Sequence, residues 1–262
     1  MVPYRHVVPA GPWAPVRSVW HEAGRVVVYG PAAIWAAAGP QGLPAAELAR
    51  HAALRTPAAR QAFVASRLLV RRTLGVLLGV SWREVRITRT MLGGPVLPDR
   101  PGVRIGISHT RQLVTVGVSR CGPLGVDAEP AERPVLPELA GRICTPAELT
   151  ALAALGGRPD RAEGLLRLWT LKESYVKALG TGLRVPLRDF GFDGFHGPQP
   201  HGPDGWSFTT RVVRIGDDRA PYVVSAAAAV ASAAPWARTG HGGGVPRVPF
   251  LKRASICATD DA

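Results

Sequence analysis

Two short motifs carry the residues best suited to chemistry, and the first is the acidic pair in LGVDAEP. Asp127 and Glu129 are two residues apart, so on a strand both carboxylates point to the same face. Such a pair is repulsive unless a cation lies between the two groups, and hard oxygen ligands favour Mg²⁺, with Mn²⁺ as an alternative. Taken alone, the pattern is more typical of two solvated charges at a sheet edge.

The second motif is the helical stretch WTLKESYVKALG. Trp169, Glu173 and Lys177 follow one another at intervals of four, so they share one face of a helix. A Glu–Lys pair at this spacing is also the commonest surface pair on helices. This face begins with tryptophan and has apolar neighbours, which favours a half-buried site. A metal ion and a lysine together can neutralise a pyrophosphate as charge develops on a leaving oxygen.

Lysine is rare in this chain, which makes its positions informative. Only three of the 32 basic residues are lysines (Lys172, Lys177 and Lys252), and the other 29 are arginines. A coding bias toward GC-rich codons would produce such a replacement. Two of the remaining lysines flank Glu173 in one helix. A compact ammonium, rather than a broad guanidinium, suits a crowded site of metal and phosphate.

Other polar side chains lie near the expected ends of helices and strands. Ser108 and His109 end the alternating segment VRIGISHT, where a histidine is commonly structural but can also bind phosphate. Arg60, Arg67 and Arg71 share one face of a helix. That stripe is interpreted first as a solvated helix face.

The composition limits the class of protein. The chain has 262 residues, is 46% hydrophobic and has a net charge of +13. It is long enough for one or two domains, and it shows neither a membrane span nor the apolar core of a signal peptide. Three cysteines without metal-ligand spacing predict reduced thiols in the cytoplasm. The charge suits a nucleic acid, a phosphorylated small molecule or an acidic protein.

The elements that must position these residues follow from the hydrophobic periods and the Gly, Pro and cap signals. Helices are predicted at residues 43–54, 57–79, 145–156 and 162–179. Strands are predicted at residues 85–87, 103–107, 114–118, 124–130, 190–192, 206–213 and 222–229, with a loop at 194–205. The order predicts an α+β fold.

The chain divides by composition into four segments. We expect an N-terminal extension at residues 1–20, an N-terminal half at 21–121, a C-terminal half at 122–234 and a loose tail at 235–262.

Taken together, the motifs resemble the Sfp-type 4′-phosphopantetheinyl transferase family. The matching segments, over about residues 55 to 192, are the basic helix with Arg60 and Arg67, the turn Gly93-Gly94-Pro95, and the motifs ISHT, GVDAE and WTLKESYVKALG. The family commonly has lysine where this chain has Gly94. The contact that this lysine makes with the nucleotide is therefore in question here, although backbone groups of the turn can still line the adenine.

The resemblance implies two similar α+β halves packed as a pseudo-twofold monomer, with the active site between them. It implies coenzyme A as substrate, Mg²⁺ or Mn²⁺ as cofactor, and transfer of the phosphopantetheine arm to a serine of an acyl, polyketide or peptidyl carrier protein. Adenosine 3′,5′-bisphosphate would be the leaving product. The pathway would be polyketide or nonribosomal peptide biosynthesis, and no membrane would be involved.

The resemblance also implies roles for individual residues. The metal ligands would be Asp127, Glu129 and Glu173, and Glu173 or a water on the metal would take the serine proton. The residues implied to contact coenzyme A are Arg60, Arg67, Gly93, Pro95, Ser108, His109, Lys172 and Lys177. Lys177 would meet the pyrophosphate, and the role of Lys172 is not defined by the motif.

Two other functions remain open from sequence. A nucleic-acid-binding protein would account for the positive charge, but only 6% of residues are aromatic and no binding-module signature is present. A Mg²⁺-dependent phosphoesterase could use the same three carboxylates with a water in place of the serine hydroxyl.

Overall fold

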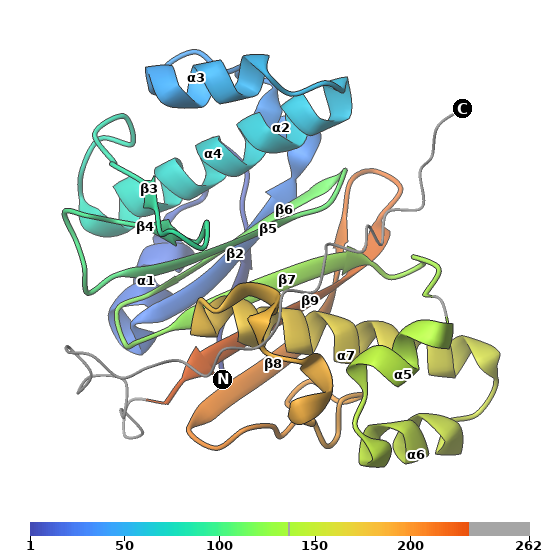
Figure 1. The fold of residues 1–262 in the computed structure, drawn as a ribbon. Coiled ribbons are helices and arrows are strands. Elements are labelled where there is room, and N and C mark those ends of the chain that lie inside the picture. The colour runs from blue at the N-terminus through green and yellow to red at the C-terminus, as the bar shows by residue number, and fades with distance from the viewer. Residues whose placement is uncertain (136, 231–262) are drawn as a thin grey trace.

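The computed structural model describes residues 1–135 and 137–230, which form two sheets with helices packed on them (Figure 1). One sheet has six strands in the order β1-β2-β6-β5-β4-β3, and the other has three in the order β7-β9-β8. Strands and helices are mixed as the sequence predicts, so the α+β class is confirmed.

The first sheet is built mainly from antiparallel neighbours. Its strands are β1 (Tyr4–His6), β2 (Arg25–Pro31), β6 (Leu113–Ser119), β5 (Arg104–His109), β4 (Pro95–Val96) and β3 (Thr88–Arg89). Strand β1 runs parallel to its neighbour, β2, and the other described pairs of this sheet are antiparallel. The accompanying helices are α1 (Ala14–Ala23), α2 (Ala32–Ala36), α3 (Ala45–Ala52) and α4 (Pro57–Leu78).

Helix α4 begins and ends where local chemistry dictates. The Thr56 side chain accepts a hydrogen bond from the Ala59 N–H, Pro57 occupies the first turn, and Gly79 ends the helix at φ 68°. These are a favourable N-cap, a preorganised first residue and a left-handed C-cap. The helix packs its apolar side against the first sheet, where Leu69 and Leu74 are fully buried.

The second sheet carries the other long helix. Its strands are β7 (Leu124–Pro130), β9 (Ala220–Ala229) and β8 (Trp206–Ile215), and α7 (Arg158–Leu179) lies against β7 and β9 (Figure 1). Shorter elements are α5 (Ala140–Ile143), α6 (Pro146–Ala154) and the 3₁₀ turns Pro137–Leu139, Gly182–Arg184 and Leu187–Asp189. Helix α6 has the capping box that Thr145 and Glu148 predict.

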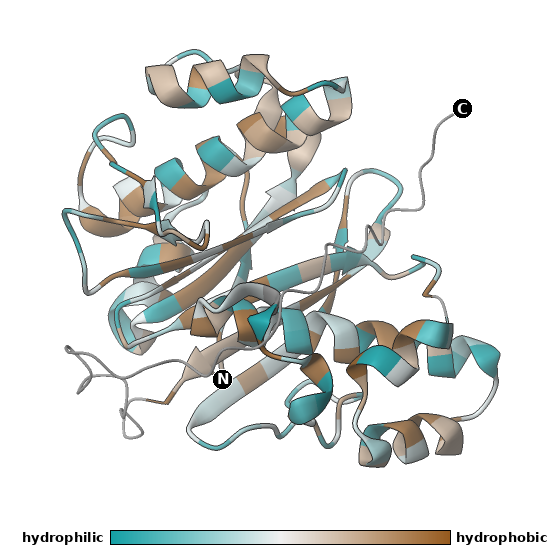
Figure 2. Ribbon diagram, viewed as in Figure 1, coloured by the Kyte–Doolittle hydropathy of each residue, from teal (hydrophilic) through white to brown (hydrophobic). Residues whose placement is uncertain are grey.

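Hydropathy follows this layering. In Figure 2 the strands are largely brown or white, while teal positions are concentrated in the helices and loops. In the described part of the chain, no helix combines the length and apolar character needed to cross a bilayer.

The structure corrects several expected elements. Residues 1–20, for which no element is predicted, form β1 and most of α1, and Val2 is fully buried. Residues 85–87 and 190–192 are not strands, since the first sheet resumes at Thr88 and the second region follows a 3₁₀ turn. The tail at 235–262 lies outside the described residues. Helices α4 and α7 have 22 residues each, although the pseudo-twofold relation itself stays a prediction.

Candidate active site

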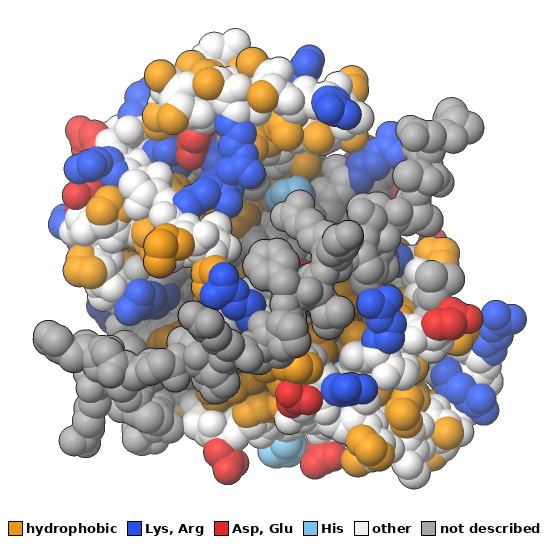
Figure 3. Space-filling model, in the orientation of Figure 1, with side chains coloured by type: hydrophobic (Ala, Val, Ile, Leu, Met, Phe, Trp, Pro, Cys, Tyr) orange, Lys and Arg blue, Asp and Glu red, His pale blue; other side chains and the backbone are white. Residues whose placement is uncertain are grey.

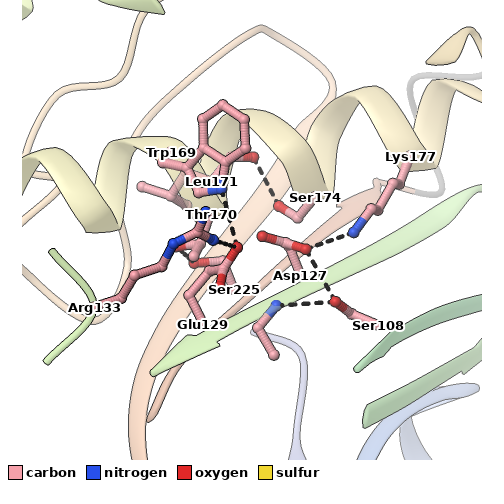
Figure 4. Close-up of polar contacts among 11 residues, drawn as sticks. Ser108, Asp127, Glu129, Arg133, Trp169, Thr170, Leu171, Ser174, Lys177 and Ser225 are labelled. Carbon is pink, nitrogen blue, oxygen red and sulfur yellow. Dashed lines mark hydrogen bonds and ion pairs between the residues drawn. The ribbon is translucent and has the colours of Figure 1, made fainter. Parts of the chain in front are cut away.

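Asp127 lies at the centre of a buried polar cluster between the two sheets. It is 5% exposed and comes from β7, as the period of the strand predicts. Its Oδ1 accepts hydrogen bonds from Lys177 Nζ at 2.5 Å and from Ser108 Oγ at 3.0 Å (Figure 4). Its Oδ2 is buried, and it has no hydrogen-bond partner among the described residues. An acceptor in this state is costly unless something else binds it.

Lys177 reaches Asp127 from the last turn of α7. Burial alone would lower the pKa of Lys177, but attraction to Asp127, and then to Glu173 and Glu129, outweighs it and raises the pKa. The ammonium is therefore charged at neutral pH. Its side chain is 35% exposed, so it lies at the edge of the buried cluster and not in its interior.

Glu173 lies one turn before Lys177 and forms a cluster of three carboxylates with Asp127 and Glu129. Its pKa is raised to about 7 by burial and by the charge of Asp127; Lys177 opposes this shift, and Glu129 adds to it. Burial and Asp127 also raise the pKa of Glu129. The three carboxylates predicted as metal ligands therefore repel one another, and Lys177 only partly compensates them.

Glu129 is held by two other side chains. Its Oε1 accepts hydrogen bonds from the guanidinium of Arg133 and from Trp169 Nε1, the latter at 3.4 Å (Figure 4). Both contacts lower the pKa of Glu129 against the effect of burial. Trp169, Glu173 and Lys177 thus present one face of α7 to β7, as their spacing predicts.

The three carboxylates are ligands of the type that a hard divalent cation prefers, but their side chains are not arranged around a common metal position. In the parts of the chain that the structure describes, no group of three or more His, Cys, Asp or Glu side chains is arranged to hold a metal ion. The fit rests on the carboxylate oxygens and on the unpartnered Oδ2 of Asp127. Lys177 and Arg133 contact two of the three carboxylates instead.

A second cluster, of arginines, lies on the α4 side. Arg67 is 8% exposed, and its Nε is buried without a partner among the described residues. Burial lowers the pKa of Arg67 to about 10, partly offset by Glu47, and the charges of Arg89 and Arg50 lower it further. Burial and Arg50 likewise lower the pKa of Arg89. This excess of positive charge suits a polyanionic ligand.

Arg50 and Arg89 are site candidates that the sequence reasoning missed. Arg89 donates to the carbonyl of Gly93 at 2.8 Å, so it lies beside the predicted Gly93-Gly94-Pro95 turn. This turn connects β3 with β4, and Gly93 adopts φ 84°. The signal available in the sequence was the position of Arg89 four residues before Gly93.

His109 interacts electrostatically with a cation from each cluster, Lys177 and Arg67. It ends β5 and is exposed, yet partial desolvation and the charges of Lys177 and Arg67 lower its pKa. A neutral imidazole in a cationic environment can gain a proton when an anion binds.

Two predicted arginine roles change. Arg71 is 1% exposed, pairs with Glu47 at 3.1 Å and donates to the Val85 carbonyl, so the α4 stripe is not a solvated face. Arg60 donates to the Leu54 carbonyl at 2.9 Å and lines a separate 320 Å³ cavity with His51 and Gln61. The structure thus brings Arg67, and not Arg60, into the arginine cluster.

Lys172, predicted to contact coenzyme A, is placed in the interior instead. It is fully buried, pairs with Glu148 at 2.9 Å and donates to the carbonyls of Leu187 and Phe190 at 2.7 and 2.5 Å. These three contacts use all the N–H bonds of its ammonium. Lys172 therefore joins α7 to α6 and to the segment after α7, and it has no donor left for a ligand.

Comparison with known proteins identifies the matching segment. Residues 123–225 match the 4′-phosphopantetheinyl transferase superfamily. The chain is 35% identical over 144 residues to the 4′-phosphopantetheinyl transferase HetI of Nostoc sp., covering 52% of this chain and 59% of that protein. It is 29% identical over 123 residues to the 4′-phosphopantetheinyl transferase Sfp of Bacillus subtilis, covering 47% and 54%.

A eukaryotic relative shows the same extent of likeness. The L-aminoadipate-semialdehyde dehydrogenase-phosphopantetheinyl transferase of Homo sapiens is 28% identical over 144 residues, covering 51% of this chain and 47% of that protein. The matches thus span about half the length of these curated relatives. The matched region contains β7, α7 and all three clustered carboxylates. Residues 123–225 of this chain are thus similar to the 4′-phosphopantetheinyl transferase superfamily.

Proposed function

We propose that this protein transfers the 4′-phosphopantetheine arm of coenzyme A to a serine hydroxyl of a carrier protein. The observation that carries the proposal is the cluster of Asp127, Glu129, Glu173 and Lys177, in a region that matches the superfamily. Anionic and cationic groups combined in one half-buried site suit a metal-assisted phosphoryl transfer.

The nucleotide end of coenzyme A would bind at the arginine cluster. Arg67, Arg50 and Arg89 have a surplus of positive charge over Glu47, and the 3′-phosphate supplies the missing anion. Arg89, already bonded to the Gly93-Gly94-Pro95 turn, offers a cation where Gly94 replaces the usual lysine. His109 would contact phosphate between this cluster and Lys177.

Mg²⁺, or Mn²⁺, would be held by Asp127, Glu129 and Glu173. When bound, the ion would relieve the repulsion among these carboxylates and neutralise charge on the pyrophosphate. Glu129 would bind the metal ion after its ion pair with Arg133 has broken.

The chemical step is a displacement at the phosphorus that carries pantetheine. The serine oxygen forms the new P–O bond, the bridging P–O bond of the pyrophosphate breaks, and adenosine 3′,5′-bisphosphate leaves. Glu173, whose pKa burial and Asp127 raise to about 7, would accept the serine proton. Lys177 would stabilise the negative charge that develops on the leaving phosphate, where a preorganised cation contributes most.

The protein partner would be an acyl, polyketide or peptidyl carrier protein. The chain has a net charge of +13, and Figure 3 shows blue side chains spread over the face drawn there. An acidic partner would be attracted to such a surface. We further expect a monomer that acts in the cytoplasm, in polyketide or nonribosomal peptide biosynthesis.

The direct test is incubation with coenzyme A, Mg²⁺ and a panel of apo carrier proteins, followed by intact-mass measurement. We expect at least one carrier to gain one phosphopantetheine group, and a carrier with its acceptor serine replaced by alanine to gain none. No mass gain on any carrier would overturn the proposal. Breakdown of coenzyme A without a carrier would instead indicate a phosphoesterase, and salt-sensitive DNA binding without transfer would indicate a nucleic-acid-binding protein.

A further inference from the structure

The junction of the two sheets is built by glycines that let three layers approach closely. A Cβ on Gly106 of β5 would lie 3.3 Å from Gly125 Cα in β7. A Cβ on Gly125 would lie 2.1 Å from the Ser174 carbonyl and 2.4 Å from the Ala178 N of α7. Side chains at these two glycines would therefore push β5, β7 and α7 apart.

The close approach fixes which polar side chains meet. Ser108 is two residues after Gly106, and Asp127 is two residues after Gly125, so each lies on the same face as its glycine. Lys177 lies next to Ala178 on α7. The three layers thus bring Ser108, Asp127 and Lys177 together, one residue from each layer (Figure 4).

Ser108 makes two hydrogen bonds across this junction. Its Oγ donates to Asp127 Oδ1 at 3.0 Å and accepts from the Ala128 N–H at 3.2 Å. Among the described residues, strand β7 pairs only with β9, so its other edge has N–H groups without a strand partner there. Ser108 satisfies one of these N–H groups and one carboxylate oxygen with a single hydroxyl, and it is only 7% exposed.

We propose that Ser108 is a positioning residue that fixes the Asp127 carboxylate. Its bond to Oδ1 holds that oxygen of Asp127 toward β5, and its bond from the Ala128 N–H fixes the hydroxyl itself. Oδ2, which has no partner among the described residues, is then the oxygen available to a cation. The inference rests on the proposed function, since it assigns Asp127 to a metal ion.

Loss of the hydroxyl should loosen Asp127 without removing it. In Ser108→Ala, Oδ1 keeps only Lys177, whose side chain is 35% exposed, and the carboxylate gains rotational freedom. Groups that orient a metal ligand typically contribute about 10- to 100-fold in metal affinity. We therefore expect Mn²⁺ to bind Ser108→Ala about 10- to 100-fold more weakly, with kcat largely recovered at saturating metal.

The test is a Mn²⁺ titration of the full chain followed by electron paramagnetic resonance, without coenzyme A or carrier. The variants are Ser108→Ala, Ser108→Thr, which restores a hydroxyl, and Thr115→Val as the matched control. Thr115 is the register partner of Ser108 and is fully buried, but its hydroxyl has no hydrogen-bond partner among the described residues. We expect weaker binding in Ser108→Ala, recovery in Ser108→Thr and parental affinity in Thr115→Val.

Two results would overturn the inference. One is parental Mn²⁺ affinity in Ser108→Ala, and the other is an equal loss in Ser108→Ala and Thr115→Val, which would indicate general loosening of the junction. Thermal unfolding of each variant shows whether it is folded. Failure of the proposed function is seen separately, because the parent protein would then modify no carrier at all.

Discussion

Two lysines on different faces of helix α7 form ion pairs, Lys172 with Glu148 of α6 and Lys177 with Asp127 of β7. The two pairs differ in how many of their polar atoms have hydrogen-bond partners. Lys172 and Glu148 are 0% and 2% exposed at their side chains. Lys172 makes three polar contacts, and Glu148 also accepts from the backbone N–H groups of Thr145 and Phe192. Lys177 and Asp127 are more open, and one buried oxygen of Asp127 has no partner in the described part of the chain.

The difference distinguishes a structural pair from the pair that we propose to act in catalysis. The Lys172–Glu148 pair is closed, because Lys172 uses all three of its N–H donors and both oxygens of Glu148 accept hydrogen bonds. The Lys177–Asp127 pair is surrounded by repelling carboxylates, as the raised pKa values of Glu173 and Glu129 show. A site that binds charged ligands must leave such groups incompletely satisfied.

The largest effect on stability should come from breaking the closed pair. Lys172→Met leaves the buried charge of Glu148 unpaired, and we expect the free energy of unfolding to fall by about 3–5 kcal/mol. Adding Glu148→Gln should restore part of this loss, because no buried charge then lacks a partner. Urea unfolding of both variants measures the effect. Parental stability in Lys172→Met would remove the distinction between the pairs.

Breaking the open pair should affect catalysis instead. Lys177→Ala should lower kcat by about 10²- to 10³-fold at saturating coenzyme A, which is typical of losing one preorganised charge. Lys177→Arg should recover only part of the rate, since the planar guanidinium is larger than an ammonium. The loss of stability should be smaller than in Lys172→Met, because the Lys177 side chain is 35% exposed while that of Lys172 is fully buried. A variant with parental kcat and slightly lower stability would make Lys177 an ordinary surface residue.

His109 offers a smaller effect that depends on pH. Its pKa is lowered in the free protein by desolvation and by Lys177 and Arg67. A bound phosphate would raise the pKa, so binding takes up a proton, and affinity should rise as pH falls through the interval between the two values. For adenosine 3′,5′-bisphosphate measured by calorimetry, we expect up to about 10-fold more gain from pH 7.5 to 5.5 in the parent than in His109→Gln. Identical pH profiles would exclude this role.

The smallest effect should be on docking of the carrier. Exposed charge complementarity acts mainly on association and is screened by salt. We expect the KM for the carrier to rise with ionic strength by a larger factor than the KM for coenzyme A. Steady-state kinetics over a series of salt concentrations gives both values. Equal salt dependence would indicate that net charge does not guide the carrier.

The arrangement of the acidic residues and Lys177 in the C-terminal half could be predicted because it follows local periods. The two-residue period of β7 aligns Asp127 with Glu129, and the four-residue spacing on α7 aligns Trp169, Glu173 and Lys177. The contacts of Lys172 could not be predicted, because its partner Glu148 lies on α6 and its carbonyl acceptors follow α7. Helix spacing specifies a face, but not what packs against it.

The N-terminal half was harder to predict for the same reason. The arginine cluster combines Arg50 of α3, Arg67 of α4 and Arg89 of β3, which no spacing within one element can reveal. Arg71 is buried and forms an ion pair with Glu47, a residue of another helix. Strand β1 has three residues and pairs with β2. The alternation of apolar and polar residues did not indicate either strand.

The most direct test of the central claim is transfer by Asp127→Ala in the carrier assay, measured by intact mass with coenzyme A and Mg²⁺. Thermal unfolding checks that the variant is folded, and Asp99→Ala, at an exposed ion pair with Arg86, serves as the control. The account predicts that Asp127→Ala stays folded but adds no phosphopantetheine to the carrier, while Asp99→Ala transfers normally. Near-parental turnover by folded Asp127→Ala at ordinary Mg²⁺ would contradict the assignment of this cluster as the active site.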